Sequence, residues 1–532
     1  MSKKRILVSD PISEIGVEAL TQHPDLQVDV NTGLAPEALL EIIGEYDGLI
    51  IRSQTKVTRA VLEAATNLKV IGRAGVGVDN VDREAATDHG VIVMNTPTGN
   101  TISTAELAFT LMLSAARNIG PGHAGVLAGD FPAARKAFKG IEIYQKRLAV
   151  IGMGRIGTEF VKRAQAFGMT VSAFDPFLTA ARAEQLKIEL AASPDEALTG
   201  ADFVTLHVPL TTETKHIINA DRLALMNKGA IVVNCARGGL IDEPALRAAI
   251  DSGHIAGCGL DVYEDEPPAS DHILFDLPRH TAFTPHLGAS TNEAQENVGI
   301  QVAEQLRDFL TAGEIRNAIN MPSLDAAALE DIGEYLGLAK SLGKFIAKLG
   351  PISPDSIRVS YHGPIADKDT PLVSRTVLHG FLSSSREDVN IVNCPAIAKE
   401  LGLELIESTI NASTEYAELI VVELKKGGEK FRLAGTIIGK SPRIVEIDKL
   451  YVDTNITGNF LIVRNDDRPG IVGLVGTSLA ENNLNIANLS LARNKSEGNA
   501  LSVIELDSPA TQEIIDKLSS EAGVLSVKAI EI

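Results

Sequence analysis

Three polar segments of the sequence each carry a side chain that could take part in proton and hydride chemistry. The segments NCARGGLID, LDVYEDEP and TPHLGAST contain Arg237, Glu266 and His286, respectively. An imidazole can accept a hydroxyl proton, and a carboxylate can fix its tautomer and raise its basicity. A guanidinium can hold a substrate carboxylate with its planar fork of donors. Together these groups suit the removal of a proton while hydride leaves the adjacent carbon atom.

Each of these segments directly follows an apolar run that predicts a buried strand. The predicted strands cover residues 230–234, 256–261 and 281–285. In open α/β sheets, ligands lie beyond the carboxyl ends of the strands, so the three side chains are expected to converge there. For any one of them taken alone, an exposed histidine or an unrelated surface ion pair remains the alternative.

The motif GMGRIG predicts a dinucleotide site, because it follows an apolar strand at 147–151 and opens a helix. Its glycines allow a tight turn, close approach of a diphosphate and close packing of helix on strand. Asp175 ends the next predicted strand, 18 residues beyond Gly157. A carboxylate there can accept a ribose 2′-hydroxyl and repel a 2′-phosphate, which favours NAD over NADP. An ordinary glycine turn, and an aspartate that caps the turn before Pro176, are the alternatives.

A second glycine-rich segment, Arg73–Val78, follows the predicted strand at 69–74. Its backbone amides can form an anion-binding nest. A packing turn is the alternative.

Two α/β series position these motifs. Residues 5–97 alternate short strands with amphipathic helices, and strands such as Gly48–Ile51 are apolar without alternation, as in parallel sheets. A long helix at about 100–118 opens a second series that runs to 288. A helix at about 291–311 follows, and a break lies at 317–322.

The C-terminal part has a different pattern. A helix is predicted over 331–349, and strand-rich sequence follows it, with a hairpin turn at Lys426–Glu429. This stretch contains no chemical motif. The last 75 or so residues predict the order βαββαβ, a ferredoxin-like plan.

Composition excludes several protein classes. The chain has 532 residues, 45% hydrophobic and 22% charged, unlike collagenous, disordered or coiled-coil proteins. No apolar run is long enough to span a bilayer and no targeting segment is recognised, so a cytoplasmic location is expected. Three distant cysteines argue against a disulfide framework or a cysteine metal site, and no metal is predicted. The net charge of −20 opposes binding to nucleic acid.

The three catalytic segments, GMGRIG and GRAGVGVDNVD together resemble the D-isomer-specific 2-hydroxyacid dehydrogenases, over essentially the whole chain. The resemblance implies a Rossmann-type NAD-binding domain at 99–289. It also implies a discontinuous flavodoxin-like substrate domain at 1–98 and 290–318. An α+β intervening domain at 324–455 and an ACT regulatory domain at 456–532 complete the implied architecture.

The resemblance also implies the residues of each site. NAD is expected at Val76, Gly152, Gly154, Arg155, Ile156, Gly157, Asp175, Val208, Cys235, Ala236, Arg237, Asp261, His286, Leu287, Gly288 and Ala289. The expected role of Cys235 is a backbone contact, since hydride transfer needs no nucleophile. The substrate is expected at Arg52, Arg73, Gly75, Val76, Gly77 and Arg135. Arg135 would come from a neighbouring subunit.

The resemblance to family members with this domain order implies a reaction for this chain. That reaction is the oxidation of 3-phospho-D-glycerate to 3-phosphooxypyruvate, the first step of L-serine biosynthesis. One alternative is a dehydrogenase or reductase for another D-2-hydroxy acid, such as glycerate, glyoxylate or hydroxypyruvate. The other is an NAD-sensing, corepressor-like binding protein. Only oxidation of the phosphorylated acid would require arginines that bind a phosphate. The two alternatives would not require them.

The ACT resemblance implies feedback regulation by serine. The ligand would lie at Asn465, Asp467 and Asn485. An ACT domain that serves only assembly is the alternative. A homo-oligomer is also implied, at least a dimer through the 100–118 region and plausibly a tetramer.

Overall fold

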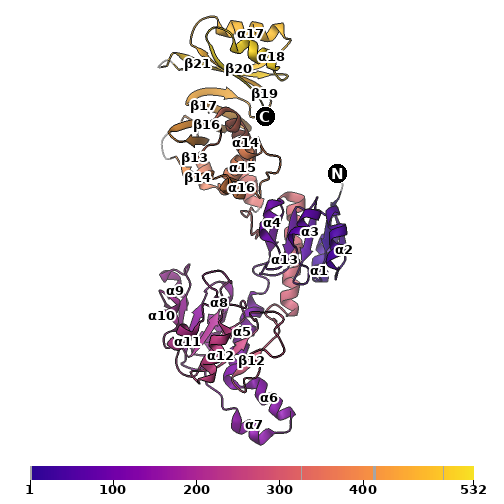
Figure 1. Ribbon diagram of the computed structural model, residues 1–532, viewed down its shortest axis with the longest axis vertical. Coiled ribbons are helices and arrows are strands. Elements are labelled where there is room, and N and C mark those ends of the chain that lie inside the picture. Colours follow the sequence, from indigo (N-terminus) through magenta and orange to yellow (C-terminus); the bar gives the residue numbers. More distant parts are fainter. Residues whose placement is uncertain (1–2, 325, 411–414, 495–496) are drawn as a thin grey trace.

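The computed structural model describes residues 3–324, 326–410, 415–494 and 497–532. Four β-sheets, numbered here in sequence order, lie along the long axis of the molecule, with the first sheet between the third and the second and the fourth at one end (Figure 1). The first two are parallel, the third is mixed and the fourth is antiparallel. The α/β fold class predicted from the sequence is therefore confirmed. Within the described ranges, no helix has the length and apolarity needed to span a bilayer.

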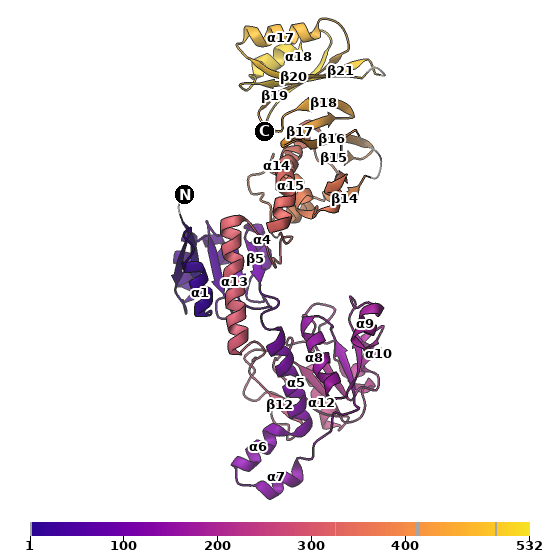
Figure 2. The same ribbon diagram turned by 180° about the vertical axis from the view of Figure 1, so that it is seen from behind.

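The first sheet has the strand order β2-β1-β3-β4-β5, the flavodoxin-like order. Its strands are β1 (Lys4–Val8), β2 (Leu26–Val30), β3 (Gly48–Ile51), β4 (Val70–Arg73) and β5 (Ile92–Asn95). Its connecting helices are α1 (Glu14–Thr21), α2 (Pro36–Ile42), η1 (Ile43–Glu45), α3 (Arg59–Ala64) and α4 (Arg83–Asp88). Helix α13 (Asn292–Ala312) returns from far along the chain and packs on this sheet (Figure 2).

The second sheet has the order β12-β11-β10-β9-β6-β7-β8, with the Rossmann-type switch point between β9 and β6. Its strands are β6 (Arg147–Ile151), β7 (Thr170–Phe174), β8 (Glu189–Leu190), β9 (Phe203–Leu206), β10 (Ala230–Asn234), β11 (Ile255–Leu260) and β12 (Thr281–Phe283). Its helices are α5 (Thr101–Arg117), α6 (Ile119–Leu127), α7 (Phe131–Ala137), α8 (Arg155–Ala166), α9 (Ala180–Leu186), α10 (Pro194–Leu198), α11 (Ala220–Leu225) and α12 (Glu243–Asp251).

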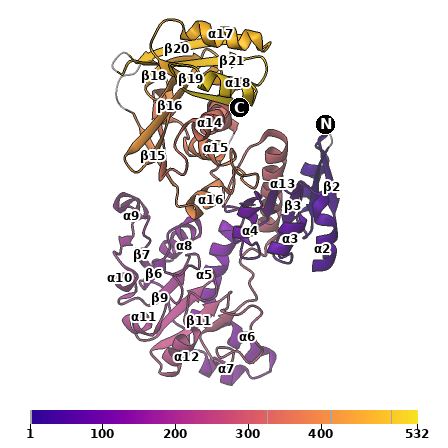
Figure 3. The ribbon, with the colours of Figure 1, turned by 45° about the horizontal axis from the view of Figure 1, so that its top comes forward.

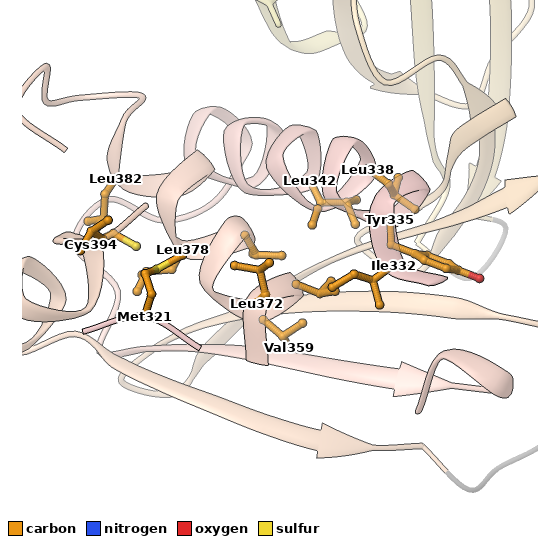
Figure 4. Close-up of a cluster of buried hydrophobic side chains, with 14 of the residues drawn as sticks. Met321, Ile332, Tyr335, Leu338, Leu342, Val359, Leu372, Leu378, Leu382 and Cys394 are labelled. Carbon is orange, nitrogen blue, oxygen red and sulfur yellow. The ribbon is translucent and has the colours of Figure 1, made fainter. Parts of the chain in front are cut away.

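The third sheet has the order β14-β13-β15-β16-β17-β18. Its strands are β13 (Ser356–His362), β14 (Glu404–Thr409), β15 (Leu419–Lys426), β16 (Glu429–Ile438), β17 (Ser441–Ile447) and β18 (Leu450–Thr454), and the predicted hairpin joins β15 to β16. Its helices are α14 (Ala326–Leu349), η2 (Pro364–Asp367), α15 (Pro371–Leu382) and α16 (Cys394–Glu400). Figure 4 shows the core, where Leu338 and Leu342 of α14 lie near Leu372 of α15.

The sequence after residue 349 is strand-rich, as predicted, but it also contains α15 and α16, which the sequence pattern did not reveal. Buried residues on all sides of α15 leave no amphipathic period that would reveal a helix. Eight of the 12 residues of α15 are buried, including the polar Ser374 and Thr376. The tertiary environment, rather than a pattern in the sequence, determines this helix.

The fourth sheet has the order β20-β21-β19-β22, which confirms the predicted βαββαβ plan. Its elements are β19 (Asn459–Asp466), α17 (Ile471–Glu481), β20 (Ile486–Asn494), β21 (Asn499–Leu506), α18 (Gln512–Ser519) and β22 (Val524–Glu531). Helices α17 and α18 lie on the face turned away from the third sheet (Figures 1 and 2). On the opposite face, Phe460 and Ile462 join the core of the third sheet.

A buried carboxylate, Glu505, joins the third and fourth sheets. It accepts hydrogen bonds from Thr454 Oγ1 at 2.7 Å, from Asn455 N at 2.8 Å and from Asn455 Nδ2 at 2.6 Å. Burial opposes ionisation of Glu505, but these bonds lower its pKa below the usual value. The charged carboxylate therefore ties the last strand of one sheet to the next.

The linker between α13 and α14 is bonded to β5, the edge strand of the first sheet. Ile319 N donates to the Val93 oxygen at 2.8 Å, and Val93 N donates to Asn320 Oδ1 at 3.0 Å. Asn393, in the part of the chain that forms the third sheet, donates from Nδ2 to the Asp88 backbone oxygen at 3.1 Å. The third sheet is thus fixed to the first.

Candidate active site

The predicted catalytic side chains come from the ends of three neighbouring strands, β10, β11 and β12. His286 Nδ1 lies 2.7 Å from Glu266 Oε2, and Tyr263 N donates to Glu266 Oε1 at 3.2 Å. The side chain of His286 is 53% exposed, so a ligand can reach the ring. The structure therefore brings His286 and Glu266 together in an orientation suited to general base chemistry.

The two groups change each other's proton affinity. The hydrogen bond with Glu266 raises the pKa of His286, against the opposing effects of burial and of Arg237. Burial favours the protonated form of Glu266, but the hydrogen bond and charge of His286 lower the pKa of Glu266 overall. His286 is therefore a stronger base than a free imidazole.

Asp261 holds the turn that carries His286. Its carboxylate accepts hydrogen bonds from Thr284 Oγ1 at 2.6 Å, Leu287 N at 2.7 Å and Gly288 N at 2.9 Å. His286 N donates to the Asp261 backbone oxygen at 2.9 Å, and residue 286 has a φ of 54°. A positive φ is unfavourable for histidine, and these bonds stabilise it. The sequence carries no signal for this positioning role.

Arg237 reaches from the second sheet to the first. Its Nε lies 3.4 Å from Asp79 Oδ2, and its Nη1 donates to the Ala236 oxygen at 2.7 Å. A Cβ atom at Gly77 would lie 2.2 Å from Arg237 Nη2, so a larger residue would displace the guanidinium. The glycine turn predicted to bind an anion therefore lies directly beside Arg237.

Arg73 and Arg52 add two cations to this turn. Arg73 Nη1 lies where a Cβ atom of Gly75 would be, so the guanidinium covers that glycine. Burial, helped by the charges of Arg237 and Arg52, lowers the pKa of Arg73 to about 10. Its buried Nε has no hydrogen-bond partner among the described residues. Like charges that converge around an unpaired donor are stabilised by a bound anion.

A cavity of about 380 Å³ opens beside Arg52, between the starts of α1 and α13. Apolar and polar side chains line it together, among them Ile12, Ser13, Gln295 and Val298. Glu14 and Glu296 line it as well, so the charge around the cavity is mixed.

Arg135 does not join this cluster within one chain. It lies on α7, and α6 and α7 project from the second unit away from the first sheet (Figures 1 and 3). The projecting pair exposes several large apolar side chains, namely Ile119, Val126, Leu127 and Phe131.

The turn between β6 and α8 has the shape that a diphosphate requires. Gly152 has a φ of 98°, and a Cβ atom there would lie 2.5 Å from the His207 oxygen. A Cβ atom at Gly157 would lie 2.1 Å from the Gly152 oxygen, whereas the space around Gly154 is open. Helix α8 begins at Arg155, so its free backbone N–H groups are available at this turn. The residues present therefore fit a dinucleotide.

Asp175 lies beside the same turn, at the end of β7. Its Oδ2 accepts from Met153 N at 2.7 Å and its Oδ1 from Phe177 N at 2.8 Å. These bonds fix the carboxylate, and each oxygen retains capacity for a further donor such as a ribose hydroxyl.

Most of the other residues expected around NAD follow strands of the second sheet, whereas Val76 follows β4 of the first sheet. Val208 Cγ1 lies 2.8 Å from where a Cβ atom of Gly152 would be. Val76, Ala236 and Ala289 are half-buried. Burial, with a contribution from Asp261, raises the pKa of Cys235 well above its usual value, so the thiol stays protonated and unreactive.

The residues expected to bind an amino acid lie on the fourth sheet and its loops. Asp467 Oδ2 lies 2.8 Å from Arg493 Nη2, and Asn485 Nδ2 donates to Asp507 Oδ2 at 2.7 Å. Asn465 is buried, and its Oδ1 has no partner within the part of the chain described. The three residues do not lie together within one chain: the end of β19 pairs with Asn499 and Ala500 at one end of β21, whereas β20 starts opposite Leu506 at the other end.

Comparison with known proteins agrees with these features. Residues 109–288 match the family model "D-isomer specific 2-hydroxyacid dehydrogenase, NAD binding domain". Residues 331–448 match the "D-3-phosphoglycerate dehydrogenase intervening domain". A D-3-phosphoglycerate dehydrogenase of Methanocaldococcus jannaschii is 42% identical, over 99% of this chain and 100% of that protein.

Two solved structures share the first two units of the fold. A glyoxylate reductase from Paecilomyes thermophila is 31% identical with a TM-score of 0.55, over 60% of this chain and 99% of that one. An NAD+-bound 3-phosphoglycerate dehydrogenase of Entamoeba histolytica is 28% identical with a TM-score of 0.51, over 60% and 99%. Full-length identity and both family models show that the chain belongs to the D-3-phosphoglycerate dehydrogenases of the D-isomer-specific 2-hydroxyacid dehydrogenase family.

Proposed function

We propose that the chain oxidises 3-phospho-D-glycerate at C2 to 3-phosphooxypyruvate with NAD, the first step of L-serine biosynthesis. The observation that carries this proposal is the convergence of Arg52, Arg73 and Arg237 next to the His286–Glu266 pair. A substrate with a carboxylate and a phosphate supplies the anionic groups that these cations lack. The names of the full-length relatives support the same substrate.

Each residue has one task in this reaction. Bound NAD supplies the hydride acceptor. Arg237 holds the substrate carboxylate and the reacting oxygen, and the ring of His286 accepts the hydroxyl proton. Glu266 keeps the imidazole in one tautomer and stabilises the imidazolium that forms. The amides of residues 75–77 add donors for the carboxylate.

The four sheets divide the work in this proposal. The substrate is bound by residues 1–98 and 290–318, and NAD by residues 99–289. Residues 324–455 connect these two parts to the ACT domain at 456–532, which regulates turnover. A second copy of the chain covers the exposed apolar side chains of α6 and α7 and supplies Arg135 to its partner's site. Exposed apolar patches of this kind support a homo-oligomer. A cytoplasmic location stays a prediction of the sequence.

The proposed function is tested by following NADH at 340 nm with NAD and 3-phospho-D-glycerate. Turnover of the phosphorylated acid is expected, with D-glycerate a much poorer substrate. Turnover of glycerate but not of its phosphate would indicate a dehydrogenase for another D-2-hydroxy acid. A protein that binds NAD but oxidises no hydroxy acid would indicate the corepressor-like alternative.

Replacing Arg52 or Arg135 by Gln is expected to raise KM for 3-phospho-D-glycerate about tenfold or more. The reason is that a charge-assisted hydrogen bond to phosphate contributes about 1.5–3 kcal/mol. Arg182→Gln, on α9, serves as the matched control. An unchanged KM in both variants would contradict a phosphate role for these residues.

Asp175→Ala is expected to reduce the preference for NAD over NADP about tenfold or more, because it removes a negative charge that repels the 2′-phosphate. The ratio of kcat/KM for the two cofactors measures this preference. Since alanine also loses the bonds to Met153 and Phe177, Asp175→Asn is compared with it: that change removes the charge and keeps an acceptor oxygen. An unchanged ratio in both variants would assign Asp175 a purely structural role.

Serine is the proposed feedback inhibitor, bound across an interface between two copies of the fourth sheet through Asn465, Asp467 and Asn485. Asn485→Ala is expected to raise the serine concentration for half-inhibition about tenfold and to leave turnover without serine unchanged. Asn482→Ala, at the end of α17, is the control. If serine has no effect on the unmodified protein, the fourth sheet serves assembly alone.

A further inference from the structure

A second histidine–carboxylate pair lies behind the catalytic one. Glu243 Oε2 is 2.9 Å from His272 Nε2, and the two side chains are only 10% and 13% exposed. Of the three histidine–carboxylate pairs in the described parts of the chain, this one is the least exposed. Its burial excludes direct contact with a substrate, so its role must be exerted through neighbouring residues.

Glu243 joins the start of α12 to the loop that carries Glu266. It is the first residue of α12, whose start is fixed because Asp242 N donates to the Ile218 oxygen at 2.9 Å. The other oxygen of Glu243, Oε1, accepts a hydrogen bond from Glu264 N at 3.0 Å. Glu264 lies two residues before Glu266 in the same loop. One buried carboxylate therefore anchors the loop that presents the partner of His286.

His272 supports the same loop from another side. Its ring packs edge-on against Tyr263, with ring centroids 5.8 Å apart. Tyr263 in turn donates its N–H to Glu266 Oε1, and its hydroxyl donates to the Thr284 oxygen at 3.1 Å. His272 Nδ1 accepts from Leu274 N at 3.4 Å, which leaves Nε2 to donate to Glu243.

A contribution to stability alone explains this arrangement poorly. Burying a carboxylate costs free energy that its partners only offset, and replacing buried ion pairs by apolar residues is often neutral or stabilising. Such a pair has its clearest use in fixing one arrangement of the groups that it touches. Here those groups are the backbone of Glu264 and the ring of Tyr263, both next to Glu266.

On the basis of the function proposed above, we propose that Glu243 and His272 are positioning residues that hold the 263–266 loop. With the loop in place, Glu266 keeps its 2.7 Å hydrogen bond to His286. Three further charged groups surround these pairs. His216 lies 3.2 Å from Glu264 at the outer side of the loop, and Arg237 and Asp261 act on His286.

The test compares His272→Phe and Glu243→Gln with the unmodified protein. The glutamine variant is isosteric, but its NH2 group would face either the Nε2–H of His272 or the N–H of Glu264, donor to donor. Both changes are expected to lower kcat about tenfold or more, the usual effect of losing a residue that orients a reacting group without touching the substrate. KM for NAD is expected to stay within twofold. His272→Gln, which keeps a side-chain donor, is expected to recover part of the loss.

A second readout separates positioning from stability. Glu266 raises the pKa of His286. If the 263–266 loop is displaced and Glu266 moves away, the pKa of His286 should fall toward that of a free imidazole. The acid limb of the kcat/KM profile, and the pKa of His286 measured by NMR, should both move to lower pH. His254→Phe is the matched control, because that half-buried ring bonds only the Leu223 oxygen at the opposite end of β11.

Unchanged kcat and an unmoved acid limb in His272→Phe and Glu243→Gln would overturn the proposal. So would a fall in thermal midpoint with no change in the pKa of His286. If the unmodified protein oxidises no hydroxy acid, the proposed function fails instead, and the NMR titration still decides whether the pair positions Glu266.

Discussion

His286→Ala is expected to lower kcat for 3-phospho-D-glycerate oxidation by about 10²- to 10⁴-fold, the usual contribution of a positioned general base. The nearby imidazoles are engaged elsewhere, since His272 is buried against Glu243 and His216 pairs with Glu264, so neither can replace His286. NAD affinity should stay within twofold, because the glycine turn and Asp175, which are proposed to hold the diphosphate and the ribose, lie at β6 and β7, away from β12. Steady-state turnover at 340 nm and titration of NADH fluorescence measure the two quantities.

The control for this change is His254→Ala, in the same unit but at the opposite end of β11. A variant at position 286 that keeps more than a tenth of the normal kcat would exclude His286 as the base. A variant that loses NAD binding would show that the residue shapes the cofactor site, since Asp261 bonds the turn around it.

Arg237→Lys is expected to lower kcat/KM by about 10²- to 10³-fold, although the charge is kept. The planar guanidinium presents several donors in fixed directions, to the substrate carboxylate and to the reacting oxygen, whereas an ammonium group is a compact charge without that fork. Because the reacting oxygen gains charge only in the transition state, kcat should fall as well as KM rise. Initial rates over a range of substrate concentrations separate the two parameters.

Arg222→Lys is the matched control, since Arg222 also pairs with a carboxylate, Asp195, at 2.6 Å in the same unit. An effect confined to KM would limit Arg237 to ground-state binding. An unchanged kcat/KM would remove it from the site altogether.

The pairing of Glu266 with His286 could be expected from the sequence for a simple reason. Each residue follows an apolar strand, and the carboxyl ends of neighbouring parallel strands lie together. The glycines of GMGRIG were equally predictable, because only glycine fits a backbone approach such as that of Gly152 to the His207 oxygen. Local sequence and sheet topology are sufficient for both.

Other features of the site depend on contacts that no local pattern reveals. The burial of Arg73 depends on how the first and second sheets face each other, and so does the contact of Arg237 with Gly77. The hydrogen bonds of Asp261 to residues 284–288 join segments more than 20 positions apart. The α6–α7 pair could not be predicted either, because neither helix has a buried residue and α6 contains three glycines.

The bonds between the α13–α14 linker and β5 determine how the parts of the chain can move. The chain crosses between the first and second units only near residues 96–100 and 284–291. A hinge rotation at these two crossings would carry everything beyond residue 313 along with the first unit, as a lever arm. In the homo-oligomer proposed above, chemical tethering of the C-terminal ends of two subunits would then resist opening between the first and second sheets of both subunits, even though each tether is attached at the far end of the molecule from the proposed hydride transfer.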